Sequence, residues 1–312
     1  MHNLDSSDSS DKSDRSDKVG LSTFYRQRLK DRWFNSQLST LYIVDFKNLV
    51  VRTLAGAVMV AVIIGATIWT PYSFGIVFML ISLLATQELL KLLTGKTTYL
   101  GGVSALLFLA MFARMSGFFS QQMQVIVWVV YGMCLVVAIL AQLWNTESNP
   151  IDTWMQVSLS QLYVAVPFAL LNMIVFLDGQ FRPLLVLALF VIIWVNDTFA
   201  YLTGSLLGKH RMFERVSPKK SWEGFIGGNL FALAAGYGLS YFEPALMWWQ
   251  WMIFAQIVVV FGTLGDLMES LLKRTLGVKD SGSAIPGHGG WLDRFDSLIF
   301  ATPVVVFYLY LI

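Results

Sequence analysis

The stretch from Ser270 to Ser297 reads SLLKRTLGVKDSGSAIPGHGGWLDRFDS and lies between two long apolar runs. Five glycines and one proline interrupt it, which predicts a tight loop with accessible backbone N–H groups. Its charged and titratable residues are Lys273, Arg274, Lys279, Asp280, His288, Asp293, Arg294 and Asp296. Lysine and arginine neutralise phosphate, and carboxylates hold Mg²⁺. The stretch therefore predicts a site for a polyphosphate and a divalent metal; the alternative is a solvated loop between two helices.

The composition on either side of this stretch is that of an integral membrane protein. Hydrophobic residues make up 56% of the 312 positions and charged residues 13%, with a mean hydropathy of +0.61. A soluble domain carries about 25% charged residues. The single cysteine, Cys134, lies in an apolar run and excludes an internal disulfide.

Apolar runs of membrane-spanning length recur along the chain, and they predict an all-α membrane protein with about nine transmembrane helices. We expect the spans near residues 50–70, 73–93, 99–117, 121–144, 158–178, 182–207, 223–242, 245–272 and 294–312. Helices are expected because backbone groups within lipid must be satisfied inside each segment.

The basic residues predict the orientation of these spans. If the N-terminus is cytosolic, 20 of the 22 Lys and Arg residues fall in segments on the cytosolic side. The two exceptions are Arg114 and Arg182. The positive-inside rule therefore places both polar loops, after the sixth and eighth spans, in the cytosol. A bacterial inner membrane is the expected location.

We expect three regions along the chain. Residues 1–49 form a cytosolic arm, of which the first 18 or so, rich in Asp and Ser, are expected to be disordered. Residues 50–178 form the N-terminal transmembrane helices and carry little chemistry. Within them, Glu88 is expected to pair with Lys91 or Lys96. Residues 179–312 form the C-terminal transmembrane catalytic region.

Two features of the sixth span and the loop after it suggest a binding site. Asp197 lies about a dozen residues into the span, where a carboxylate must face protein, water or a cation; a buried packing role is the alternative. The loop then brings two cations just before the seventh span. Backbone N–H groups near a helix start, with adjacent lysines, form an anion site, although the lysines can also be a simple membrane anchor. The residues concerned are Ser217, Pro218, Lys219 and Lys220.

The eighth and ninth spans each bring carboxylates toward the cytosolic side. If these spans pack together, Asp266 and Asp293 can converge on one divalent ion, and carboxylate ligands suit Mg²⁺. Asp296 is either a further ligand or a partner of Arg294. His288 has no second histidine at metal-ligand spacing, and a role as a base is a hypothesis.

Two blocks of the chain resemble the signature of the phosphatidate cytidylyltransferase (CDP-diacylglycerol synthase) family. The first is Ser270-x-Leu272-Lys273-Arg274-x4-Lys279-Asp280-x-Gly282-x2-Ile285-Pro286-x-His288-Gly289-Gly290-x-x-Asp293-Arg294-Phe295-Asp296. The second is Asn196-Asp197-x-x-Ala200-Tyr201-x-x-Gly204 followed by Ser217-Pro218-Lys219-Lys220-Ser221-x-Glu223-Gly224-x-x-Gly227-Gly228. Trp291 departs from the aliphatic residue usual in the family, which removes no ligand.

The resemblance implies transfer of CMP from CTP to phosphatidate, giving CDP-diacylglycerol and pyrophosphate. It implies these catalytic residues: Lys219, Lys220, Lys273, Arg274, Lys279, Arg294 and His288. The implied substrate-binding residues are Ser217, Pro218, Gly289 and Gly290, and the implied metal ligands are Asp266, Asp293, Asp197 and Asp296. The expected cofactor is Mg²⁺, with room for a second cation. The expected partners are CTP, phosphatidate and the bilayer, with a second copy of the chain as a candidate and no nucleic acid.

Two other functions are compatible with parts of the sequence. A CTP-dependent polyprenol or phytol kinase would transfer a phosphoryl group to a lipid alcohol and would need a base to deprotonate it. An ion-coupled transporter would explain an intramembrane aspartate and glycine-rich spans. The full signature argues against the kinase, and the clustering of charges at one membrane face argues against the transporter.

Overall fold

Long apolar helices account for most of the computed structural model, which describes residues 46–95, 100–146, 149–285, 287 and 289–312. The first helices are α2 (Phe46–Trp69), α3 (Pro71–Thr94), α4 (Gly101–Met115), α5 (Gln121–Leu140) and the short 3-10 helix η1 (Ala141–Leu143). One long segment follows, made of α6 (Pro150–Ser160), the π-helical turn η2 (Gln161–Ala165) and α7 (Val166–Val175), and the 3-10 turn η3 (Leu177–Gly179) ends it. The remaining helices are α8 (Pro183–Leu207), α9 (Trp222–Leu239), α10 (Trp248–Thr275) and α11 (Leu292–Leu309).

The prediction of an all-α membrane protein is confirmed in its coarse form. Within the described ranges, six helices are long and apolar enough to cross a membrane: Val50–Trp69, Pro71–Thr94, Gln121–Leu143, Pro150–Val175, Pro183–Leu207 and Trp248–Thr275. α4 is a shorter apolar helix. α9 and α11 coincide with the seventh and ninth expected spans. The count of nine spans remains a prediction.

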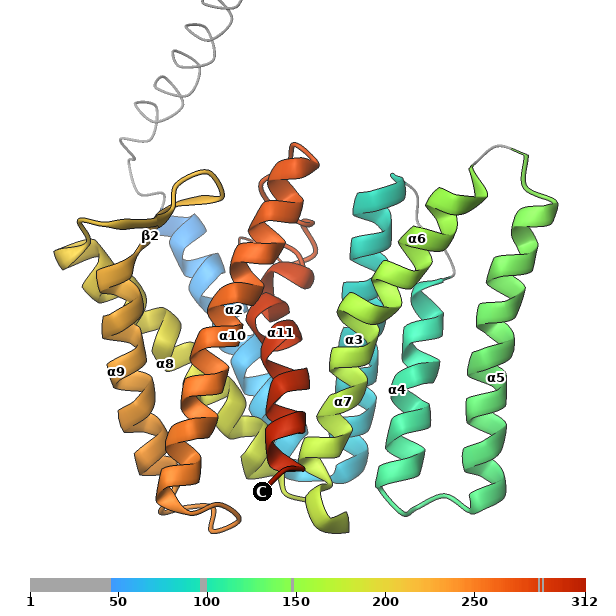
Figure 1. The fold of residues 1–312 in the computed structure, drawn as a ribbon, viewed down its shortest axis with the longest axis horizontal. Coiled ribbons are helices and arrows are strands. Elements are labelled where there is room, and N and C mark those ends of the chain that lie inside the picture. Colours follow the sequence, from blue (N-terminus) through green and yellow to red (C-terminus); the bar gives the residue numbers. More distant parts are fainter. Residues whose placement is uncertain (1–45, 96–99, 147–148, 286, 288) are drawn as a thin grey trace, which may run out of the picture. The chain divides into compact units, whose positions relative to one another are not determined.

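A small antiparallel hairpin follows α8, where the sequence analysis expects only a loop. Its strands are β1 (Arg211–Phe213) and β2 (Ser217–Ser221), paired through Arg211 with Ser221 and Phe213 with Ser217. The Ser221 hydroxyl then accepts the N–H of Gly224 at 3.2 Å, which caps the start of α9. In Figure 1 the C-terminal ends of α8 and α10 lie at the same end of the helices as β2.

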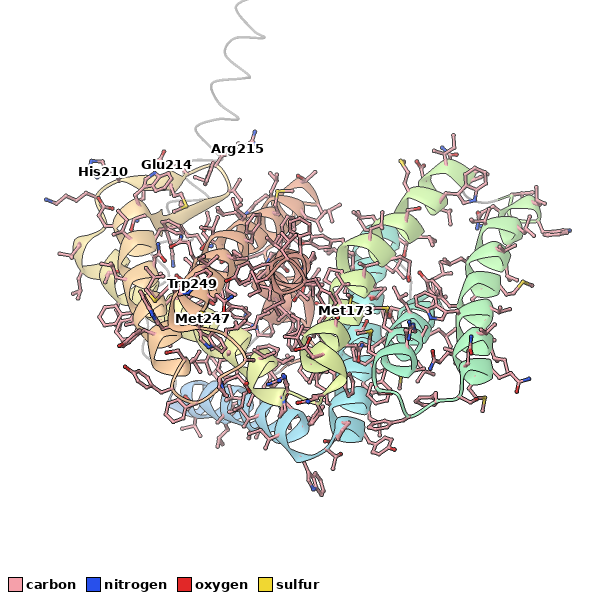
Figure 2. All side chains as sticks on the ribbon, turned by 60° about the horizontal axis from the view of Figure 1, so that its bottom comes forward. Met173, His210, Glu214, Arg215, Met247 and Trp249 are labelled. Carbon is pink, nitrogen blue, oxygen red and sulfur yellow. The ribbon has the colours of Figure 1, made fainter. Side chains whose placement is uncertain are left out.

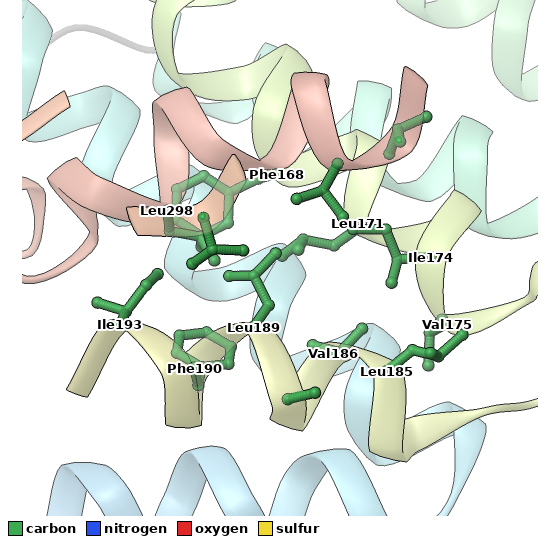
Figure 3. Packing of buried hydrophobic residues seen from close by; sticks show 14 of the residues in the cluster. Phe168, Leu171, Ile174, Val175, Leu185, Val186, Leu189, Phe190, Ile193 and Leu298 are labelled. Atoms are coloured by element: carbon green, nitrogen blue, oxygen red, sulfur yellow. The ribbon is translucent and has the colours of Figure 1, made fainter. Parts of the chain in front are cut away.

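The part of the chain from Arg52 to Ile312 forms one compact unit around a hydrophobic core. Figure 3 shows Phe168, Leu171 and Ile174 of α7 facing Leu189 and Phe190 of α8, and Leu298 of α11 joins this layer. The side chains of Leu171, Ile174 and Leu189 are fully buried. This apolar layer holds α7, α8 and α11 together.

Small residues allow α8 and α9 to lie against one another at close range. The buried residues of α9 are Gly224, Gly228, Ala232 and Gly236, one at every fourth position; of these, Gly224 and Gly228 lie against α8, and Gly236 lies against α10. A Cβ on Gly228 would lie 2.7 Å from both the carbonyl oxygen and Oδ1 of Asn196. Small residues at such spacing permit close backbone packing between membrane helices. This packing brings β2 next to the part of α8 that carries Asp197.

We expect Gly228→Ala to lower the free energy of unfolding by about 1–3 kcal/mol, because the added methyl group has no room against α8. Gly238→Ala is the matched control in the same helix, since a Cβ at Gly238 meets nothing within 4 Å. The control is expected to be neutral or stabilising by about 0.5–1 kcal/mol. Thermal unfolding in detergent measures both variants. Equal stability of the two would contradict the close packing of α8 and α9.

Candidate functional site

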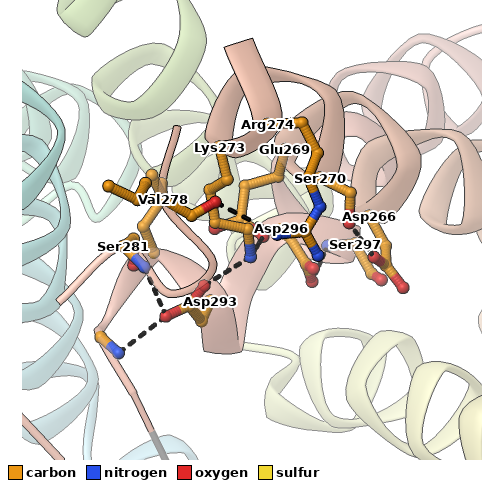
Figure 4. A network of polar contacts seen from close by, with 12 residues as sticks. Asp266, Glu269, Ser270, Lys273, Arg274, Val278, Ser281, Asp293, Asp296 and Ser297 are labelled. Carbon is orange, nitrogen blue, oxygen red and sulfur yellow. Dashed lines mark hydrogen bonds and ion pairs between the residues drawn. The ribbon is translucent and has the colours of Figure 1, made fainter. Parts of the chain in front are cut away.

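A polar cavity of about 500 Å³ lies among α2, α8, α10 and α11, and we call it the aspartate cavity. Its lining includes all four aspartates that the sequence predicts as metal ligands, Asp197, Asp266, Asp293 and Asp296. Lys273 and Arg294 also line it. Figure 4 shows Asp266 on α10 and Asp293 and Asp296 on α11, so carboxylates from two helices gather here. The expected packing of the eighth and ninth spans is therefore present.

A second cavity of about 230 Å³, which we call the hairpin cavity, lies between β2, α8, α9 and α10. Lys219 and Lys220 line it, as do Tyr201 and Phe225. Asp197 and Asp266 line both cavities, so the two are neighbours across these aspartates. The predicted anion site at Lys219 and Lys220 thus adjoins the predicted carboxylate site.

Lys220 connects the hairpin to α10. Its Nζ lies 2.6 Å from Oδ2 of Asp266, and both side chains are about one-third exposed or less. An ion pair at this level of exposure contributes modestly to stability, on the order of 1 kcal/mol or below. Its main effect is to hold the end of β2 next to Asp266, which lines both cavities.

Lys273 forms the most deeply buried ionic contacts of the site. Its Nζ lies 2.9 Å from Oε2 of Glu269, one turn earlier on α10, and 2.6 Å from Oδ1 of Asp293 on α11. The Glu269 side chain is 0% exposed and that of Asp293 is 5% exposed. Charges removed from water to this degree are tolerated when they are paired. Lys273 therefore joins α10 to α11 at the wall of the aspartate cavity.

The second oxygen of Asp293 orders the glycine-rich loop. Oδ2 accepts the N–H of Ser281 at 2.9 Å and the N–H of Gly290 at 2.8 Å (Figure 4). Gly289 has a φ of +82°, and a Cβ there would lie 2.7 Å from the same oxygen. The structure thus gives Gly289 and Gly290 a packing role around Asp293. Their predicted role in substrate binding remains a prediction.

Glu88 is a residue of this region whose partners sequence reasoning missed. It does not pair with Lys91 as expected; its carboxylate accepts the N–H groups of Trp291 and Leu292, at 2.9 and 3.2 Å, and the hydroxyl of Ser281. The other expected partner, Lys96, lies outside the described residues. A carboxylate near the end of an otherwise apolar span was the available signal, and Lys91, close in the sequence, was a misleading guide to its partner.

Several predicted residues do not line either cavity. Among the described residues, Arg274, Lys279, Ser217 and Pro218 do not belong to either lining. Arg274 and Lys279 are exposed, and Arg274 donates to the carbonyl of Val278 at 3.1 Å. His288 lies outside the described residues. Figure 2 shows His210, Glu214 and Arg215 at the hairpin end, away from Met247 and Trp249 near the start of α10.

The donors around the aspartate cavity have the right chemistry for a hard cation, because they are carboxylate oxygens. Two of them, on Asp266 and Asp293, are engaged by lysines. Within the described ranges, no three His, Cys, Asp or Glu side chains form a group that could hold a metal ion as they stand. Asn196 Oδ1, next to Asp197, is buried without a hydrogen-bond partner. The oxygen donors therefore suit Mg²⁺ in type. In the structure, Asp266 and Asp293 are paired with lysines.

Apolar membrane helices with lysines and carboxylates around two adjoining cavities define an α-helical membrane protein with clustered charged side chains at these cavities. The chain belongs to the cytidylyltransferase family, whose sequence profile matches residues 50–312. This confirms the family resemblance that the two sequence blocks indicate.

Curated relatives of the same family match a shorter stretch of the chain. A phosphatidate cytidylyltransferase of Staphylococcus haemolyticus (strain JCSC1435) is 46% identical over 121 residues, which is 38% of this chain and 46% of the relative. Proteins of the same name from Staphylococcus aureus (strain COL) and Staphylococcus saprophyticus are 47% and 45% identical over the same shares. The chain thus spans about half the length of the curated relatives it matches.

We expect Lys273→Met to destabilise the fold by about 3–5 kcal/mol, because Glu269 and Asp293 would be left as unpaired buried carboxylates. Lys279→Met is the control: Lys279 is exposed, and its replacement is expected to change stability by no more than about 0.5 kcal/mol. Denaturant or thermal unfolding in detergent compares the two. Similar stability of both variants would contradict the bridging role of Lys273.

Proposed function

We propose that this protein transfers the CMP moiety of CTP to phosphatidate. A phosphate oxygen of phosphatidate bonds to the α-phosphorus of CTP, and the bond from that phosphorus to the bridging oxygen of the β-phosphate breaks. The products are CDP-diacylglycerol and pyrophosphate. The observation that supports the proposal most directly is that Asp197 and Asp266 line two adjoining cavities, one with Lys219 and Lys220 and one with Lys273 and Arg294.

The chemistry of this transfer agrees with the side chains around the cavities. The attacking oxygen is already anionic at neutral pH, so the reaction needs no strong general base. Its difficulty is to bring two anions together and to stabilise the departing pyrophosphate, which fixed cations accomplish by position and charge. Lys219 and Lys220 would hold phosphates on the hairpin side, and Lys273 and Arg294 on the other. The aspartates would lie between them.

The lining of the aspartate cavity also suits a lipid substrate. Besides its charged residues, it contains Met59 and Val60 of α2 and Phe190, Ile193 and Trp194 of α8. These side chains would contact the glycerol and the first part of the acyl chains. A phosphatidate molecule would then enter sideways between helices, with its phosphate toward Lys273 and Arg294.

The Mg²⁺ ion would be held by Asp266 and Asp293, with Asp197 and Asp296 as further carboxylates, and a second cation is compatible with four ligands. Bound there, Mg²⁺ would offset the charge of the triphosphate and of the leaving pyrophosphate. In the structure, Lys220 and Lys273 form ion pairs with Asp266 and Asp293. In the complex with substrates, the two lysines would contact the phosphates instead.

We further propose the inner membrane of a bacterium as the location, with the N-terminus and both cavities on the cytosolic side. The distribution of basic residues supports this orientation. CTP would then reach the cavities from the compartment in which it is made. A homodimer stays a candidate assembly.

Purified protein, supplied with labelled CTP, phosphatidate and Mg²⁺, is expected to release pyrophosphate and form CDP-diacylglycerol. Asp266→Asn is expected to lower turnover by about 100-fold, because a carboxylate between the two cavities is lost. Asp152→Asn is the control, since Asp152 is exposed on α6 and belongs to neither cavity lining. CDP release on addition of a polyprenol or phytol, with phosphatidate unchanged, would contradict the proposal and identify a kinase. Absence of turnover with every lipid would contradict an enzymatic role.

Removal of divalent metal by a chelator is expected to abolish turnover, and added Mg²⁺ is expected to restore it. In Asp266→Asn, the Mg²⁺ concentration for half-maximal turnover is expected to rise by about tenfold or more, because one carboxylate ligand is missing. The Asp152→Asn variant should keep the wild-type value. Full turnover in chelator, or an unchanged Mg²⁺ requirement in Asp266→Asn, would contradict the metal assignment.

A further inference from the structure

The side chain of Glu88, on α3, forms hydrogen bonds with the backbone at the start of α11. Oε2 accepts the N–H of Trp291 at 2.9 Å, and Oε1 accepts the N–H of Leu292 at 3.2 Å and the hydroxyl of Ser281. The first N–H groups of a helix have no partner within the helix, and a negative charge is favoured there. No side chain of α11 itself caps this end. Glu88 therefore caps α11 from a different part of the chain.

Two glycines of the loop leave the space that this carboxylate occupies. A Cβ on Gly290 would lie 1.7 Å from Oε1 of Glu88, and a Cβ on Gly282 would lie 2.8 Å from Oε2. Neither position could carry a side chain without displacing the carboxylate. The backbone at Gly282 and Gly290 is thus shaped around Glu88.

Ser281 is held from both sides by this arrangement. Its hydroxyl donates to Glu88, and its N–H donates to Oδ2 of Asp293. Asp293 in turn binds Lys273, and both line the aspartate cavity. A change at Glu88 therefore acts on the cavity through Ser281 and through the first turn of α11, which carries Asp293 and Arg294.

We propose that Glu88 is a positioning residue for the reaction, one that fixes Ser281 and residues 290–292 so that Asp293, Arg294 and Lys273 face the aspartate cavity. The inference rests on the proposed function, because it assigns the cavity to phosphate chemistry. Glu88 itself lines neither cavity and need not touch substrate. Its effect on turnover is through the geometry of the loop.

The test uses Glu88→Gln, because the two carboxylate oxygens accept different N–H groups. A glutamine has one acceptor oxygen, so its NH₂ group would face either Trp291 or Leu292. The matched control is Glu243→Gln: the Glu243 carboxylate also accepts a backbone N–H, from Ala245 at 3.1 Å, and is ion-paired with Arg182 at 3.2 Å, but it lies between α9 and α10 and lines neither cavity. Both variants are purified as full chains in detergent.

Two readouts separate positioning from simple stabilisation. In Glu88→Gln we expect faster hydrogen exchange of the amides in residues 281–292 and a kcat per folded molecule lower by about 10- to 100-fold, since small misplacements of reacting groups have effects of that size. We expect a smaller change in KM for CTP, because Lys219 and Lys220 stay on the hairpin. Glu243→Gln should leave exchange in residues 281–292 and kcat per folded molecule unchanged.

The outcomes distinguish this inference from the proposed function. If the wild-type protein turns over CTP and phosphatidate while Glu88→Gln keeps its kcat per folded molecule, the positioning role is wrong and the proposed function stands. If exchange in residues 281–292 does not change in Glu88→Gln, the inference is overturned by that result alone. If the wild-type protein shows no turnover, the proposed function is wrong, and the positioning role assigned through it is wrong with it. If Glu88→Gln does not fold, Ser281→Ala, which removes one donor to Glu88, must show the same two effects at smaller size.

Discussion

The ammonium group of Lys273 has two carboxylates within 2.9 Å, one on its own helix and one on the next. In a bundle made mainly of apolar helices, a charge at this depth is stable when its partners are also fixed. The ion pair with Glu269 fixes the position of the ammonium group along α10. The ion pair with Asp293 fixes how α10 and α11 are rotated relative to each other. Much of the polar region depends on this contact, because Asp293 uses its remaining oxygen to order the loop before α11.

The same contacts describe an electrostatic balance at the two cavities. Asp266 is paired with Lys220, and Asp293 shares Lys273 with Glu269. Each of these lysines lines one of the cavities in which phosphates are proposed to bind. A carboxylate and a phosphate cannot share one lysine without cost, so binding of nucleotide and of a divalent cation should be thermodynamically linked. The cation would take the place of the lysine at the carboxylate, and the lysine would be available to the phosphate.

The sequence predicted the coarse fold because hydropathy and charge placement act over whole segments. It predicted that Asp266 and Asp293 meet, because the eighth and ninth spans were expected to pack together, and it named Asp197 and Asp296 as further ligands. All four line one cavity, and their role as metal ligands remains a prediction. It did not predict the hairpin of β1 and β2, which has few residues and no strong alternation. It could not give the partner of Glu88, because that partner is set by how α3 lies against residues distant in the chain. It also grouped Arg274 and Lys279 with the site, although in the structure their exposed side chains lie outside both cavities.

The cap that Glu88 provides joins residues 193 positions apart in the chain, Glu88 and Ser281. During synthesis on the ribosome, α3 enters the membrane long before Ser281 and α11 have been made. Until then, the carboxylate of Glu88 lacks its three donors, Ser281, Trp291 and Leu292, and must stay near water at the membrane surface. A nascent chain that ends before α11 would therefore expose a carboxylate without the donors that it has in the complete fold.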